Sequence, residues 1–192
     1  MSTKQKLFSH FQSKNMKLLN RIVMAPMTRN FSPNNVPGND VVSYYRRRAQ
    51  GGVGLIITEG TCVNHIASNC YPNVPYIHGE ESITGWTNVV DAVHDVGGQI
   101  AAQLWHVGAV RKMGMPPNPE VNGYGPSGMN VPGKQNREIM TLQDIDLVIN
   151  AFVEAAITAK SIGFDAIELH GAHGYLLDQF FWSGTNQRND KS

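Results

Sequence analysis

Short apolar segments alternate with longer amphipathic segments along this chain, and the cycle repeats four times. The apolar segments are short and rich in branched residues, which favours strands over helices. The longer segments that follow have apolar residues at helical spacing, which predicts amphipathic helices. The predicted strands are 21–25, 53–58, 99–105 and 165–169, and the predicted helices are about 40–49, 86–96 and 141–159, with a last one starting near Tyr175. The pattern therefore predicts four consecutive βα units.

Local signals mark the ends of these helices. Asp40 can cap the first helix, which Gly51 and Gly52 end. Thr141 and Asp144 have the spacing of a capping box at the start of the longest helix.

Nearly continuous apolar strands between amphipathic helices indicate an α/β protein with a parallel sheet covered by helices. Doubly wound sheets and (β/α)8 barrels both fit this pattern. The first strand is followed by Ala-Pro-Met-Thr at residues 25–28, without the glycines of a dinucleotide-binding turn. Polar residues instead collect where strands end, which is where barrel enzymes place their active sites. These residues are Thr28, Glu59, Gln103, His106, His170 and His173. The barrel is therefore favoured.

A complete barrel needs eight strands and typically about 250 residues. The 192 residues supply four predicted strands, so we interpret residues 1–192 as the N-terminal part of a single barrel domain. A half-barrel that pairs with a partner or with itself is the alternative. A long insertion rich in proline and glycine spans about 106–140, and loops of that length are usually functional.

Composition narrows the class of protein. The formal net charge of +1 argues against nucleic acid as a partner. Two cysteines cannot build a disulfide-dense scaffold, and no apolar run approaches the ~20 residues that cross a bilayer. With no visible secretory signal, we expect a cytoplasmic globular protein, and homo-oligomerisation stays open. In the entry segment 1–19, Leu7, Phe8 and Phe11 are expected to cover an apolar surface.

The densest group of chemically useful side chains follows the fourth strand. His170, His173 and Tyr175 lie within six positions, and Gly171 and Gly174 allow sharp turns between them. Two neutral imidazoles can each donate an N–H to a developing oxyanion, and a phenol with a pKa of about 10 can deliver a proton. A structural role, with the imidazoles bonded to the backbone, is the first alternative.

A metal site is the second alternative for this group. Both imidazoles could ligate zinc, with His106 or Glu168 as a third ligand in principle. No third ligand stands out in the sequence, so the prediction is that no metal binds.

Each of three further residues has two possible roles. The Gln103 amide suits a ring with carbonyl and N–H edges, although a buried glutamine bonded to the backbone is an equal alternative. Thr28 can bond a ligand oxygen or cap a turn, and Trp105 can line a pocket or pack in the core.

Several segments of the chain, in order, resemble the Old Yellow Enzyme family of FMN-dependent ene-reductases. They are Asn-Arg-Ile-Val-Met-Ala-Pro-Met-Thr-Arg at 20–29, Ile-Thr-Glu-Gly at 57–60, Gln-Leu-Trp-His at 103–106, His-Gly-Ala-His-Gly-Tyr-Leu-Leu at 170–177, and Asn-Gln-Arg-Asn-Asp at 186–190. The family usually has a tyrosine two places after that aspartate, whereas Ser192 stands there in this chain. The resemblance covers nearly the whole chain and implies that residues 1–192 belong to one FMN-binding (β/α)8 barrel domain.

The resemblance also implies roles for individual residues. The flavin would contact Pro26, Met27, Thr28, Gly60, Gln103 and His170, with the Thr28 hydroxyl tuning its redox potential. His170 and His173 would hold the carbonyl oxygen of the substrate, and Tyr175 would be the proton donor in a pocket lined by Trp105.

The implied reaction is the reduction of a small electrophilic alkene such as an enone, with NAD(P)H reducing the flavin. A 2,4-dienoyl-CoA reductase type of flavoenzyme, with a downstream iron–sulfur site, and an inactive half-barrel are the alternatives. In the family, the flavin phosphate site and an arginine near the ring come from later strands. We therefore expect the 192 residues by themselves to bind FMN poorly and to be inactive.

Overall fold

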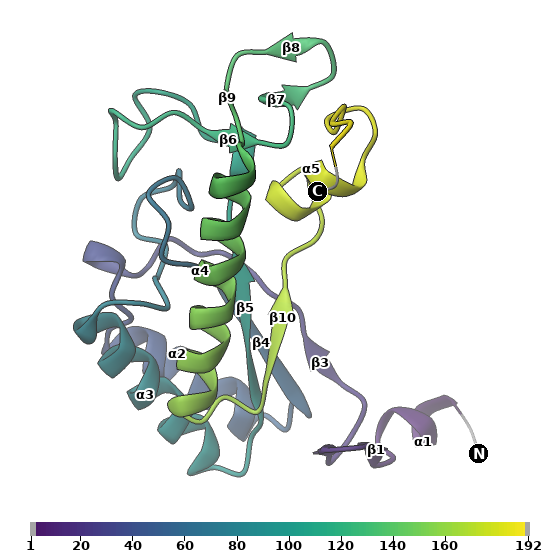
Figure 1. The fold of residues 1–192 in the computed structure, drawn as a ribbon. Helices are drawn as coiled ribbons and strands as arrows, with labels where there is room; N and C mark the ends of the chain where they lie inside the picture. The colour runs from purple at the N-terminus through teal and green to yellow at the C-terminus, as the bar shows by residue number, and fades with distance from the viewer. Residues whose placement is uncertain (1–2, 191–192) are drawn as a thin grey trace.

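A four-stranded parallel sheet forms the centre of the chain (Figure 1). The computed structural model describes residues 3–190. The strands are β3 (Val23–Met24), β4 (Leu55–Cys62), β5 (Ile100–Trp105) and β10 (Ala166–Leu169). They lie side by side in the order in which they occur in the chain. A doubly wound sheet reverses its strand order part-way, so this order is that of a (β/α)8 barrel, of which the chain forms the first four βα units.

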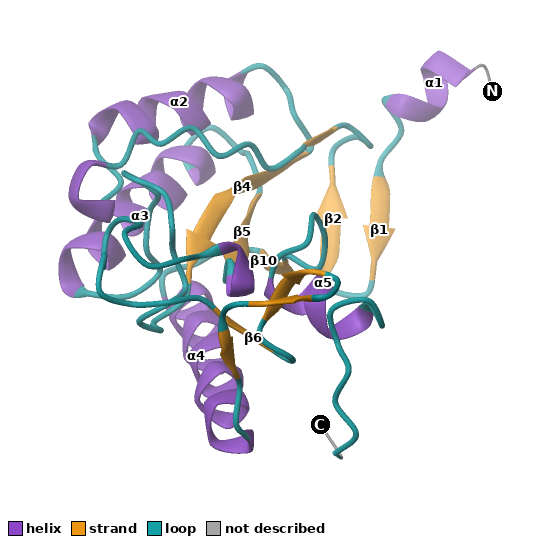
Figure 2. Cartoon of the chain, turned by 90° about the horizontal axis from the view of Figure 1, so that it is seen from above, coloured by secondary structure: helices purple, strands orange, loops and turns teal. Residues whose placement is uncertain are grey.

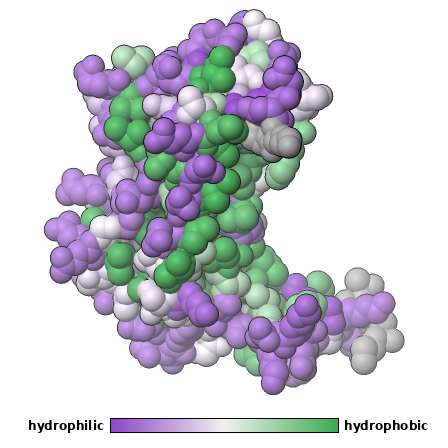
Figure 3. All heavy atoms as spheres, viewed as in Figure 1, coloured by the Kyte–Doolittle hydropathy of each residue, from purple (hydrophilic) through white to green (hydrophobic). Residues whose placement is uncertain are grey.

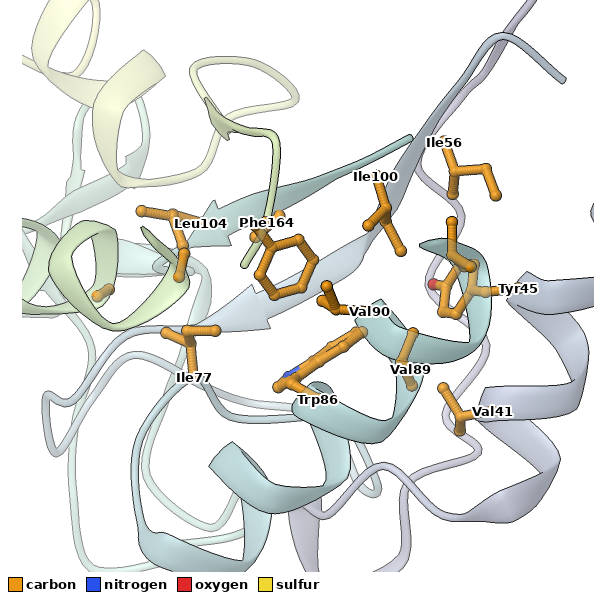
Figure 4. Packing of buried hydrophobic residues seen from close by; sticks show 14 of the residues in the cluster. Val41, Tyr45, Ile56, Ile77, Trp86, Val89, Val90, Ile100, Leu104 and Phe164 are labelled. Carbon is orange, nitrogen blue, oxygen red and sulfur yellow. The ribbon is translucent and has the colours of Figure 1, made fainter. Parts of the chain in front are cut away.

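Three helices cover one face of this sheet (Figure 2). They are α2 (Asn39–Gln50), α3 (Glu80–His94) and α4 (Leu142–Ser161), and each follows a strand. Their buried faces meet the outward side chains of β4 and β5 in one apolar cluster. At its centre the fully buried Trp86 lies between Tyr45 and Phe164, and its indole N–H donates to the carbonyl of Tyr76 at 2.9 Å (Figure 4). This cluster holds the helices in place and leaves the other face of the sheet for the site.

The helix starts differ in how well the sequence predicts them. The capping box of α4 is present, because Thr141 Oγ1 accepts from the Asp144 N–H and Asp144 accepts from the Thr141 N–H. The prediction that Asp40 caps α2 was wrong. Its N-cap is Gly38, and Asp40 lies inside the first turn, where its carboxylate accepts from the neighbouring N–H of Val41 at 2.9 Å.

Strand β4 extends four residues beyond its predicted end at Thr58. A bulge makes this extension possible, since Ile57 pairs with Ala101 whereas Gly60 already pairs with Gln103. Within the bulge, the buried Thr58 hydroxyl accepts from the Gln103 backbone N–H at 3.0 Å. The bulge therefore fixes the main chain of β5 next to the site.

A small hairpin contacts the amino ends of the strands. It consists of β1 (Phe11–Ser13) and β2 (Met16–Leu18) and follows the short helix α1 (Thr3–Leu7). Phe11 packs on a cluster that contains Leu18 and Leu55, as expected. Leu7 and Phe8 are 48% and 62% exposed, so the expectation that they cover an apolar surface is wrong within this structure.

The segment between β5 and α4 is folded. It contains the 3-10 turn η2 (Gly108–Val110) and the strands β6 (Tyr124–Gly125), β7 (Met129–Val131), β8 (Lys134–Gln135) and β9 (Glu138–Ile139). Arg111 organises it, because its fully buried guanidinium donates to carbonyl groups from two separate stretches of chain. The acceptors are Asn69, Met115, Pro116, Asn118 and Val121.

One face of the molecule exposes apolar side chains. They come from α4 and β10 and form part of the hydrophobic surface in Figure 3. They include Ile149, Val153, Ile157, Ile167 and Leu169. The outer edge of β10 pairs with no other strand of the described residues. In a closed barrel a fifth βα unit packs against this face. Within residues 3–190, no helix is both long and apolar enough to cross a membrane.

Candidate active site

A cavity of about 710 Å³ lies beside the carboxyl ends of β3, β5 and β10. Seven of the predicted site residues line it together, namely Pro26, Thr28, Gln103, Trp105, His170, His173 and Tyr175. Asn30, Tyr71, Glu168, Leu169, Gly171 and Ala172 complete the lining. The residues that could hold an oxyanion or deliver a proton therefore share one space with the two polar side chains expected to bind a ring.

Two predicted cofactor residues, Met27 and Gly60, are not among the lining residues. Met27 follows Pro26 with 51% of its surface exposed. At Gly60, an added Cβ would lie 2.4 Å from the ring of Trp105, so packing against that ring explains the glycine. Their contact with a flavin stays a prediction.

The imidazoles and the phenol meet edge to face. The ring centroids of His170 and His173 are 5.4 Å apart, and those of His170 and Tyr175 are 5.0 Å apart. Burial and the neighbouring His173 lower the pKa of His170, so its imidazole is neutral at pH 7. Neither imidazole has a hydrogen bond from its ring nitrogens to another described residue, so both are available to a ligand.

The turn after β10 presents these rings to the cavity. His173 and Gly174 have φ angles of 60° and 73°, and the left-handed conformation of a histidine is a strained feature that is typical of functional sites. The fully buried Gln179, on α5 (Leu176–Phe181), donates to the Gly174 carbonyl at 2.6 Å. Gly171 lies outside the turn, which is formed at residues 173 and 174, so the predicted sharp turn at Gly171 is absent.

Aromatic rings form the wall beside the phenol. Trp105 stacks between Tyr71 and His170, with centroid distances of 5.6 and 5.8 Å. The hydroxyl of Tyr71 lies 3.2 Å from that of Tyr175. Burial and this hydrogen bond raise the pKa of Tyr71, which keeps its hydroxyl protonated at neutral pH. Sequence reasoning missed Tyr71, because it lies in a long loop where no pattern connects it to Tyr175.

Two other lining residues, Thr28 and Gln103, carry free polar groups. Among the described residues, the Thr28 hydroxyl has no hydrogen-bond partner. The Gln103 amide nitrogen donates to Glu168 at 2.8 Å, while its amide oxygen has no partner in residues 3–190. Thr28 and Gln103 thus leave a hydroxyl and a carbonyl-type acceptor for a ligand.

Two polar residues expected at this edge lie elsewhere. Glu59 is buried and accepts from Arg29 and from the Tyr45 hydroxyl, away from the cavity. His106 is fully buried, with its Nε2 2.9 Å from the Nδ1 of His65. Burial and the nearby His65 lower the pKa of His106 well below its usual value. Both residues support the framework of the site.

Because His106 is buried with a lowered pKa, we expect acid to destabilise the fold. An unfolded histidine has a pKa of about 6.5, so between that value and the depressed native pKa the unfolded state binds more protons. We expect the free energy of unfolding to fall as the pH decreases below about 6.5, by up to about 1.4 kcal/mol per pH unit for this group. Urea unfolding at pH 7.5 and 5.5 measures this, and His106→Gln flattens the dependence. Substitution of the exposed His10 by Gln should leave the pH dependence of the unfolding free energy unchanged. An equal pH dependence in His106→Gln and His10→Gln would contradict the prediction.

The described part of the chain contains no set of ligands for the alternative of a metal site. No group of three or more His, Cys, Asp and Glu side chains is placed there to hold an ion.

Comparison with known proteins identifies the family of this chain. A sequence profile of the NADH:flavin oxidoreductase / NADH oxidase family matches residues 6–192. The chain belongs to this family. It is 42% identical over 182 residues to putative 12-oxophytodienoate reductase-like protein 1 of Arabidopsis thaliana, covering 92% of this chain and 55% of that protein.

Solved structures agree. Morphinone reductase in complex with tetrahydroNAD superimposes with a TM-score of 0.89 at 34% identity, over 96% of this chain and 54% of that one. The old yellow enzyme homologue from Zymomonas mobilis has a TM-score of 0.86 at 31% identity, over 97% and 54% of the two chains. The resemblance to the Old Yellow Enzyme family is therefore confirmed, and the chain spans about half the length of the relatives it matches.

The cavity fits part of the FMN that this family uses. The free Thr28 hydroxyl and Gln103 amide oxygen match the carbonyl and N–H groups along one edge of the flavin ring. No Lys or Arg of the described residues lines the cavity, so its wall offers the phosphate group no cation. The residues present therefore fit the ring edge but not the phosphate.

Proposed function

We propose that the complete protein is an FMN-dependent oxidoreductase that uses NAD(P)H to reduce activated C=C bonds of enones or related electrophilic alkenes. The observation that carries this proposal is that His170, His173 and Tyr175 face the same cavity as Thr28 and Gln103. A group that stabilises negative charge, a proton donor and a ring-binding edge are the parts that such a reduction needs from the protein.

The roles of the residues follow from their chemistry. When bound and reduced, FMN supplies the hydride. His170 and His173 donate N–H groups to the carbonyl oxygen, on which negative charge develops. Tyr175 then delivers its proton to the α-carbon of the substrate. Trp105 restricts how the substrate lies between them and shields the site from water.

A pair of matched substrates tests this function. We expect the complete protein to oxidise NADH or NADPH in the presence of 2-cyclohexenone and to form cyclohexanone. We expect no turnover with cyclohexanone itself, which has the same carbonyl group but no C=C bond. Gas chromatography identifies the product. Formation of the allylic alcohol, or no reaction with any electrophilic alkene, would overturn the proposal.

The 192-residue chain by itself should bind flavins weakly, and the phosphate group of FMN should add little to the affinity. Because no cation of the described residues lines the cavity, FMN and riboflavin should bind this chain with dissociation constants within a factor of about three, less than one ordinary hydrogen bond provides. Quenching of flavin fluorescence measures both constants. Preference of this chain for FMN by tenfold or more would show that it already contains a phosphate site.

A further inference from the structure

Glu168 is a cavity residue to which the proposed function assigns no role. It lies on β10 directly opposite Gln103 on β5. Figure 1 shows these two strands side by side. Partners in a parallel ladder point to the same face of a sheet, and both side chains line the cavity. The distance from Gln103 Nε2 to Glu168 Oε1 is 2.8 Å. This hydrogen bond is charge-assisted and therefore stronger than a neutral one.

The chemistry of the pair determines which way the amide points. A carboxylate can only accept hydrogen bonds, so Gln103 must turn its NH₂ group toward Glu168 and its oxygen away. The main chain of Gln103 is also fixed, because its N–H donates to the buried Thr58 hydroxyl. Gln103 is 5% exposed and has little room to rearrange. The amide oxygen of Gln103 is thus left as an acceptor that faces away from Glu168.

We propose that Glu168 is a positioning residue that locks the Gln103 amide so that its oxygen accepts from the imide N–H, N3, of a flavin ring. The proposal rests on the proposed function, since it concerns the same cofactor. An imide presents one N–H between two carbonyls, so a freely rotating amide could meet either kind of group. A locked acceptor selects the N–H and thereby fixes the position of the ring along its edge.

A flavin methylated at N3 tests this role through binding alone. The probes are FMN and 3-methyl-FMN, titrated into the flavin-free complete protein with fluorescence quenching as the readout. In the wild type we expect N3-methylation to weaken binding by about 10- to 100-fold, as expected for a lost buried hydrogen bond. In Glu168→Gln the neighbouring amide can donate or accept, so Gln103 is no longer locked. We expect the discrimination to fall to within about threefold.

Two further variants separate positioning from general damage. Glu154→Gln removes a carboxylate from the exposed face of α4 and should keep the wild-type discrimination. The exchanged pair, Gln103→Glu with Glu168→Gln, again places a donor beside a locked acceptor and should restore discrimination. This rescue would not occur if Glu168 acted only through the stability of the fold.

The outcomes distinguish this inference from the function on which it rests. If the wild type binds neither flavin, the proposed function fails. If the wild type binds FMN but does not discriminate, or if Glu168→Gln discriminates as strongly as the wild type, the function stands and the positioning role is overturned. Failure of the exchanged pair to discriminate, when it still binds FMN, also contradicts the positioning role.

Discussion

Replacing Tyr175 by Phe should slow enone reduction by the complete protein about 10²- to 10⁴-fold, which is the usual contribution of a positioned general acid. The substitution removes only the hydroxyl, and the ring keeps its edge-to-face contacts with Trp105 and His170. Reduction of the flavin by NAD(P)H should be largely kept, because it needs no proton from this group. Stopped-flow absorbance, recorded separately for the two half-reactions, measures the difference.

Tyr71→Phe is the matched control for this experiment. It removes the hydroxyl 3.2 Å from that of Tyr175 but keeps the proposed proton donor. We expect it to slow enone reduction by less than about tenfold, the worth of one ordinary hydrogen bond. Enone reduction at the wild-type rate in Tyr175→Phe would remove Tyr175 from the mechanism.

Breaking the ion pair of Arg29 and Glu59 should lower the free energy of unfolding by about 3–5 kcal/mol, because it leaves an uncompensated buried charge. The Glu59 side chain is fully buried and accepts from Arg29 Nε at 3.1 Å. It also lies 3.3 Å from the Tyr45 hydroxyl, and burial together with this negative charge raises the pKa of Tyr45. Arg29 follows Thr28 directly, so the pair also fixes the loop beside the cavity.

A double-mutant cycle measures this coupling. Arg29→Met leaves the fully buried Glu59 carboxylate unpaired, and Glu59→Met leaves the partly buried Arg29 guanidinium unpaired. The double variant leaves neither charge and should be less destabilised than the sum of the two single variants. Arg46→Met, on the exposed face of α2, is the control and should stay within about 0.5 kcal/mol of the wild type. Urea unfolding of the chain gives all four values. Additive single effects, or single effects below about 1 kcal/mol, would contradict a buried, coupled pair.

Several features that depend on local pattern were predicted well from the sequence, although Asp40 does not cap α2 and α3 (Glu80–His94) begins six residues before its predicted start at Trp86. The strands from Ile100 and from Ala166 lie within one residue of their expected starts, and the capping box at Thr141 is present. The barrel-type order also followed from local information, because polar residues at strand ends imply a shared edge of the sheet. Likewise, His170, His173 and Tyr175 are neighbours in sequence, so their proximity needed no knowledge of the fold.

Features that depend on distant partners were not predicted. The bulge in β4 is stabilised by a hydrogen bond between Thr58 and Gln103, and Arg111 is buried only because five carbonyl groups surround it. Tyr71 reaches Tyr175 across 104 positions of sequence. Glu59 and His106 were expected at the edge of the sheet with the site residues, but Arg29 and His65 bind them elsewhere. Single-sequence patterns carry no information about such partners.

We propose that the cavity at the carboxyl ends of the strands binds the flavin ring. Crystals of the complete protein grown with FMN test this binding mode. We expect difference density for the ring beside Pro26 and Thr28, with its pyrimidine edge at Gln103 and with His170 and His173 over the space where a substrate would lie. Density for the ring at any other place, or an empty cavity at saturating FMN, would contradict it.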